Sequence, residues 1–393
     1  MRIYLKQSVY EAAIERINFL FDEFENVVVG MSGGKDSTVC FELCLQVARE
    51  RNRLPLNALW IDQEGEWQGT VDYMESVMTN PEVKPYWFQM PMVITNNASS
   101  SNRYVHCWEE GKELEWMHQK HPISIKNNIY GEQRFHKLFE KIFKVEFPGI
   151  KSCYISGVRA EETPKRLMSL TTTPVYKYIT WGTLLNKKNQ HYTFYPLYDW
   201  SYTDIWKVIC DNGWSYNRIY DELYRYGATI KDMRISNIHH ETSKQSLMFI
   251  HEIEPETWER VLKRVDGANT IEHLAKESFT CPSKLPYMFE SWKEYAEYLI
   301  ENIIQEEKNK NFINGVISKY VPIYSDKKIN NAFYQVIITT ILSSDWDLTK
   351  LANYNIQQDS YTYRNWKKGI VNEYTFKYNK FIPAVEMDRL KNG

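Results

Sequence analysis

Short apolar runs alternate with amphipathic stretches through the first part of the chain. Residues 27–29 are three consecutive valines, which predict a buried parallel strand. Apolar residues then recur at helical spacing from 39 to 47. The alternation repeats, with strands expected at 56–61, at 86–90 and in a run ending at 157, and helices at 9–24, 70–78 and 135–145. Strands alternating with helices predict an α/β fold, a doubly wound and mainly parallel sheet.

The pattern changes further along the chain. Beyond residue 245 the apolar spacing is helical, with helices expected at 255–265, 291–305 and 331–343, in a region rich in Lys, Tyr and Asn. We therefore expect two domains, an α/β domain at 1–245 and a mainly helical extension at 246–393.

The turn after the first strand carries the clearest chemistry. Residues 32–37 read S-G-G-K-D-S. Glycines let the backbone approach a ligand closely, and free N–H groups at a helix N-terminus favour an anion. A lysine and serine hydroxyls add donors, so the turn suits phosphate. It fits neither G-x-x-x-x-G-K-[ST] nor G-x-G-x-x-G. A chance glycine-rich turn is the alternative.

Other candidate residues follow later strands. Asp62 ends the second strand, where an acidic residue contacts a ribose or an adenine amine, or caps a turn. Beyond Gly157, Arg159 and Arg166 are candidates to grip a phosphate or sulfate, with Glu161 or Glu162 holding an arginine in place. A surface cluster of salt bridges is the alternative for these charges.

Two further stretches have structural and functional interpretations. The polar stretch 96–122 reads as a surface insertion or a lid, and its His and Cys spacing fits no standard zinc site. At 195–206, Ser201 and Asp204 predict an N-cap with a capping box. Asp199 is read either as a cap or as a neighbour of the substrate.

Three blocks in order resemble one family. S-G-G-K-D-S resembles the PP-loop of N-type ATP pyrophosphatases and of the phosphoadenosine phosphosulfate (PAPS) reductase family, and G-x-R-x-x-E…R at 157–166 and P-L-x-D-W-[ST]-x-x-D-[IV]-W at 196–206 resemble two further signatures of that family. The resemblance covers about residues 20–235. It implies an adenine nucleotide alpha hydrolase-like fold, ATP or PAPS as ligand, and Mg²⁺ as a candidate cofactor.

The resemblance also implies roles for individual residues. Lys35, Asp36, Arg159 and Arg166 are the implied catalytic residues, and Ser32, Gly33, Gly34, Lys35, Asp36, Ser37, Asp62, Gly157 and Arg159 the implied nucleotide contacts. No set of metal-ligating residues is assigned.

The chain departs from the reductases in its cysteines. It lacks the family's C-terminal Glu-Cys-Gly-Leu-His tail, and its six cysteines include no CxxC pair. We therefore expect no iron–sulfur cluster and no sulfite formation from PAPS. Cys40 and Cys44 share a helical face, either as metal ligands or as buried thiols.

The C-terminal region resembles an extension of uncharacterised function on PAPS reductase-like proteins, some encoded beside a ParB-like partner and described as regulators. Residues 366–368 and 377–380 interleave basic and aromatic side chains, which fits a nucleic-acid face or a solvated surface.

Composition narrows the classes further. The 393 residues carry a net charge of −2, so no basic excess points to nucleic acid. No apolar run reaches the ~18–20 residues that span a membrane, and the N-terminus lacks a signal-peptide core, so we expect a cytoplasmic protein. Two hypotheses remain, an enzyme of ATP pyrophosphatase, adenylating or sulfonucleotide chemistry, and a nucleotide-sensing regulator.

Overall fold

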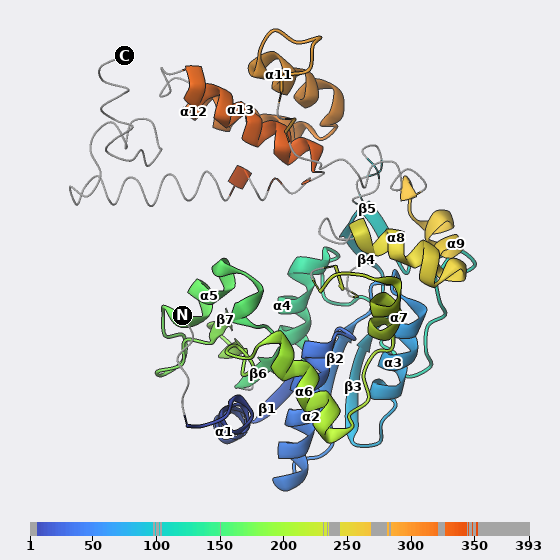
Figure 1. Cartoon of the computed structure of the whole chain (residues 1–393), viewed down its shortest axis with the longest axis vertical. Helices are drawn as coiled ribbons and strands as arrows, with labels where there is room; N and C mark the ends of the chain where they lie inside the picture. Colours follow the sequence, from blue (N-terminus) through green and yellow to red (C-terminus); the bar gives the residue numbers. More distant parts are fainter. Residues whose placement is uncertain are drawn as a thin grey trace, which may run out of the picture. The chain divides into compact units, whose positions relative to one another are not determined.

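Figure 1 shows the computed structural model of the chain. The structure describes residues 6–96, 99, 102, 104–149, 151–230, 232, 233, 235, 244–268, 281, 282, 284–320, 327–343, 345, 348, 351 and 352. The chain divides into two compact units, one of Met1–Ile94 with Tyr104–Ile271 and one of Thr95–Arg103 with Glu272–Gly393. The predicted domain division after residue 245 stays a prediction.

A six-stranded sheet forms the centre of the first unit. Its strand order is β3-β2-β1-β6-β8-β7, and every neighbouring pair is parallel except β7 with β8 at one edge. The strands are β1 (Asn26–Gly30), β2 (Leu56–Ile61), β3 (Val83–Phe88), β6 (Ser152–Ile155), β7 (Gly182–Asn186) and β8 (His191–Phe194). The predicted α/β fold with a mainly parallel sheet is confirmed.

Helices cover both faces of the sheet because alternate strand residues point to opposite sides. Val27 and Val29 belong to a core that includes α1, α2, α3 and α6. On the opposite face, Tyr154 of β6 packs its ring 4.4 Å from that of Phe139 in α4. The helices of this unit are α1 (Val9–Glu23), α2 (Lys35–Glu50), α3 (Gln68–Met78), α4 (Phe135–Glu146), α5 (Pro164–Thr171), α6 (Tyr202–Asn212), α7 (Ile219–Tyr226), α8 (Lys244–Ile253) and α9 (Pro255–Arg264), with a 3₁₀ turn η1 (Ala160–Glu162).

Three boundaries differ from the sequence prediction. The third strand begins at Val83, ahead of Pro85, which is tolerated because β3 lies at the edge of the sheet. The strand expected to end at Gly157 ends at Ile155, so the glycine lies in the loop that follows. The stretch 96–122, expected to be irregular, contains β5 (Tyr104–Cys107), which pairs with β4 (Met92–Thr95).

The second unit has a helical core of its own. Its helices are α11 (Trp292–Ile303), α12 (Glu307–Tyr320) and α13 (Lys327–Leu342), which agrees with the helices expected at 291–305 and 331–343. Leu299 and Ile300 of α11 pack with Phe333 and Ile337 of α13. The segments 366–368 and 377–380 lie outside the described residues. Within the described ranges no helix is long and apolar enough to cross a bilayer.

Candidate functional site

The S-G-G-K-D-S loop connects β1 to α2 and lies against α3. Gly33 has a φ of +71°, which a side chain rarely adopts, and a Cβ there would lie 2.7 Å from Cγ2 of Thr70. Gly34 is the N-cap of α2 and offers no side-chain cap to the first N–H groups of the helix. The loop therefore places the N-terminus of α2 beside the first turn of α3, at the carboxyl end of the sheet.

Hydroxyl groups of Ser37 and Thr38 stabilise the loop through hydrogen bonds. Ser37 Oγ donates to the Gly34 carbonyl at 2.8 Å and accepts from Ser32 N at 3.3 Å. Thr38 Oγ1 contacts the same carbonyl at 3.1 Å and the Tyr73 hydroxyl at 2.8 Å. These bonds fix the loop's shape, and the predicted ligand contacts of Ser32 and Ser37 stay predictions.

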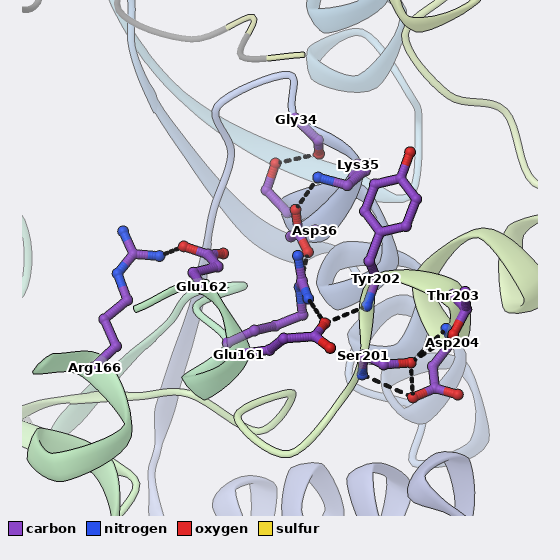
Figure 2. A network of polar contacts seen from close by, with 12 residues as sticks. Gly34, Lys35, Asp36, Glu161, Glu162, Arg166, Ser201, Tyr202, Thr203 and Asp204 are labelled. Atoms are coloured by element: carbon purple, nitrogen blue, oxygen red, sulfur yellow. Dashed lines mark hydrogen bonds and ion pairs between the residues drawn. The ribbon is translucent and has the colours of Figure 1, made fainter. Parts of the chain in front are cut away.

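A chain of charged contacts joins the loop to the second signature (Figure 2). Lys35 Nζ lies 2.8 Å from Asp36 Oδ2, and Asp36 Oδ1 accepts from Arg159 Nε. Arg159 Nη1 donates to Glu161 Oε2 at 3.0 Å, and the Arg159 side chain is only 5% exposed. Gly157 permits this arrangement, since a Cβ there would lie 2.4 Å from the Asp36 carbonyl oxygen. The structure thus brings together Lys35, Asp36, Gly157 and Arg159.

Arg166 takes a different partner. It forms an ion pair with Glu162 one helical turn away, and its side chain is 40% exposed. Figure 2 shows this pair beside Glu161. Glu161 and Glu162 therefore each hold one arginine. In this structure Arg166 forms a surface salt bridge, which was the alternative interpretation of its sequence. Its predicted contact with phosphate or sulfate stays a prediction.

Asp62 lies within the interior at the end of β2. Its carboxylate is 0% exposed, and Oδ1 accepts from Glu64 N at 2.9 Å, a turn cap of the kind that the sequence also suggested. Oδ2 accepts from Gln89 Nε2 at 2.8 Å and contacts His118 Nε2 at 3.0 Å. Burial lowers the pKa of His118, but the charge and hydrogen bond of Asp62 outweigh it and the pKa is raised. The predicted contact of Asp62 with a ribose stays untested.

The third signature, residues 196–206, includes the start of α6 and contacts the candidate site. Ser201 and Asp204 form the predicted capping box, and Tyr202 N donates to Glu161 Oε2 at 2.7 Å. The N-terminus of α6 is therefore hydrogen-bonded to Glu161, which also pairs with Arg159. Asp199 instead pairs with Arg16 of α1 through two contacts of 2.7 and 2.6 Å, so it links the segment before α6 to α1.

Sequence reasoning missed contacts made by side chains of α6, α7 and α9. Tyr202 and Tyr220 place their rings 5.5 Å from Lys35 Nζ. Arg264 of α9 donates to Glu64 at 2.7 Å, and both side chains are buried. The only sequence signal is the wealth of aromatic and charged residues, because the paired residues lie far apart along the chain.

Glu254 contacts the neighbouring helix. Its Oε2 accepts from Gln68 N at 2.7 Å and its Oε1 from Gly69 N at 3.0 Å. These are the first N–H groups of α3, so a carboxylate from the start of α9 satisfies them and complements the helix dipole.

The cysteines do not gather at this site. Cys40, Cys44 and Cys153 are buried, and within the described part of the chain no group of three or more His, Cys, Asp or Glu side chains is arranged to hold a metal ion. Cys281 belongs to the second unit, and burial raises its pKa to about 11. Its thiol is therefore protonated at neutral pH, unlike a nucleophilic cysteine. The expected lack of a cluster stays a prediction.

Comparison with known proteins places the chain in a family. Residues 26–227, just over half of the chain, match the phosphoadenosine phosphosulfate reductase domain, and 227–383 match a domain of unknown function, DUF3440. The chain therefore belongs to the phosphoadenosine phosphosulfate reductase domain family.

Individual relatives are more distant. The uncharacterized protein YbdN of Escherichia coli K12 is 26% identical over 350 residues, which cover 84% of this chain and 83% of that protein. Candida glabrata FMN adenylyltransferase with FMN and an ATP analogue is 16% identical, at a TM-score of 0.35 over 60% of this chain and 70% of that one. Candida auris PAPS reductase in its phosphate complex is 15% identical, at 0.32 over 55% and 85%. Likenesses at these scores carry no argument about ligand or activity.

Proposed function

We propose that the chain binds an adenine nucleotide, ATP or PAPS, with its phosphate or sulfate groups at the N-terminus of α2. One observation carries the proposal: Lys35, Asp36, Gly157 and Arg159, from two separate signatures, meet where β1 and β6 end. Parallel α/β sheets bind ligands at the carboxyl ends of their strands, and an open helix N-terminus favours an anion.

The linked ion pairs of Lys35, Asp36, Arg159 and Glu161 are arranged so that an anion can bind beside them. Lys35 and Arg159 neutralise Asp36 and Glu161, and these contacts engage only some of the N–H groups of the two cations. The remaining N–H groups are available to phosphate or sulfate oxygens without loss of the pairs. Because the carboxylates hold both cations in position, little ordering is required when the ligand binds.

The same residues would serve catalysis by positioning and charge stabilisation. Cleavage of ATP between the α- and β-phosphates, adenylation of an acceptor, and sulfonucleotide chemistry all develop negative charge on phosphate or sulfate oxygens. Lys35 and Arg159 would stabilise that charge. Asp36 is the candidate ligand for Mg²⁺, but both of its oxygens already contact cations. The residues therefore fit an anion held by cationic side chains better than a resident metal ion.

A nucleotide-sensing regulator is the second candidate. The raised pKa of Cys281 is unfavourable for only one of the enzyme chemistries above, sulfite formation through a reactive thiolate. Such a regulator would bind the nucleotide without consuming it and respond through a protein or nucleic-acid partner, for which a ParB-like protein stays a prediction.

Two measurements test these proposals. Native mass spectrometry of the purified protein should show a bound adenine nucleotide, and titration with ATP, PAPS and AMP should identify the preferred one. Pyrophosphate or sulfite release would establish the enzyme, whereas binding without turnover would establish the regulator. A protein that binds none of these nucleotides contradicts both.

A further inference from the structure

A tyrosine hydroxyl stands at the N-terminus of α2. Lys35 N, the first N–H group of the helix, donates to the hydroxyl of Tyr220 at 3.2 Å. Tyr220 comes from α7, which is distant from the loop along the sequence, and is only 5% exposed. A Cβ on Gly34 would lie 3.6 Å from the same hydroxyl. The hydroxyl therefore lies at the N-terminus of α2, the kind of position that favours an anion.

The hydrogen of this hydroxyl lacks an acceptor. A tyrosine hydroxyl donates one hydrogen bond as well as accepting, and that of Tyr220 accepts from Lys35. Among the described residues none accepts its hydrogen, although buried donors are ordinarily satisfied. Burial, together with the charge of Asp36, raises the pKa of Tyr220, so the group remains a protonated donor at neutral pH.

The neighbouring residues hold this donor in place. Asn217 Oδ1 accepts from Ile219 N at 3.0 Å and fixes the start of α7. Asn217 Nδ2 donates at 2.8 Å to the hydroxyl of Thr70, the residue that Gly33 of the loop approaches. The Tyr220 ring also packs against the edge of Trp206 at 5.3 Å. The donor is therefore positioned relative to the loop before any ligand arrives.

We propose that Tyr220 is a ligand-binding residue of this site, whose hydroxyl donates a hydrogen bond to a phosphate or sulfate oxygen of the nucleotide. The proposal rests on the proposed function. The hydroxyl and the side chains of Lys35 and Arg159 then surround the same anion, while the Lys35 N–H group holds the hydroxyl in place. A hydrogen bond from a neutral donor to a charged oxygen is stronger than one between neutral groups.

Tyr220→Phe tests the proposal because it removes the hydroxyl and keeps the ring. Tyr216→Phe is the matched control: its ring also lies 5.3 Å from Trp206, but its hydroxyl donates to Asp221 at 2.8 Å. Isothermal titration with ATP and PAPS should show affinity about ten- to a hundredfold weaker in Tyr220→Phe. Tyr216→Phe should bind as the wild type does.

The outcomes separate this inference from the proposed function. If the wild type binds neither nucleotide, the proposed function fails. If the wild type binds and Tyr220→Phe binds equally well or more tightly, the hydroxyl does not donate to the ligand and only this inference fails. Should Tyr220→Phe not fold, a nucleotide-bound structure of the wild type decides. A Tyr220 hydroxyl more than roughly 3.5 Å from every phosphate and sulfate oxygen overturns the inference.

Discussion

Gly157→Ala should disturb the candidate site through a single methyl group. The Gly157 loop runs directly over the first turn of α2, and an added Cβ would lie 2.4 Å from the carbonyl oxygen of Asp36 and 2.8 Å from Ser37 N. Both neighbours are backbone atoms, so no side chain can rotate away. An ordinary contact begins near 3.4 Å, so the loop and the helix must separate by about 1 Å.

The size of the effect follows from this separation. Overpacking of this kind costs about 1–3 kcal/mol of folding stability. The separation also moves Arg159 away from Asp36, and misplacement by about 1 Å can cost a hundredfold in a positioned site. We therefore expect nucleotide affinity to fall tenfold or more.

Isothermal titration and urea unfolding measure the two effects. Gly315→Ala is the control, because Gly315 lies in α12 with open space around its missing Cβ. It should keep wild-type affinity and gain about 0.5–1 kcal/mol of stability. A Gly157→Ala protein with wild-type affinity and stability would refute the close approach of the two signatures.

Three other predictions concern charged groups. Arg264→Ala leaves a buried carboxylate without its cation and should lower the free energy of unfolding by about 3–5 kcal/mol in urea titration; a loss below about 1 kcal/mol would contradict a buried pair. Arg159→Ala should abolish binding of PAPS, whereas the exposed Arg166→Ala should weaken it only slightly; equal losses in titration would argue against the difference in their partners. Hydrogen bonds from Lys177 and Tyr176 lower the pKa of Glu23 to about 2, so its stabilisation is complete above its ordinary pKa and is lost as the pH falls from about 4.5 towards 2. Glu23→Gln should therefore remove about 1 kcal/mol of that acid sensitivity, and identical pH profiles would contradict the shift.

The sequence was sufficient to predict the mainly parallel sheet, although not its strands β7 and β8, and the proximity of the glycine loop to Gly157 and Arg159. Consecutive valines, the glycine turn and the next amphipathic stretch are local signals, and they identify β1, the loop and α2 within a few residues. The capping box at Ser201 is equally local. Gly157 and Arg159 could be associated with the loop because they follow a strand expected in the same parallel sheet.

Contacts between distant segments could not be predicted in this way. Nothing local to Tyr220 or Arg264 indicates that one reaches Lys35 and the other Glu64. Asp62 illustrates the same limit, because its hydrogen-bond partners Trp87 and Gln89 lie in and directly after β3, and His118 lies in the stretch 104–121. The pairing of β4 with β5 was missed for a related reason, since both strands are short and flank a polar stretch.

Titration of a loop variant with adenine nucleotides tests the central claim most directly. Lys35 and Asp36 lie at the start of α2 and contact each other and Arg159 rather than the apolar core. The account predicts that the wild type binds ATP or PAPS, and that Lys35→Ala combined with Asp36→Ala abolishes binding without loss of the folded state by circular dichroism. Unchanged affinity in the folded double variant would contradict the assignment of this loop as the nucleotide site.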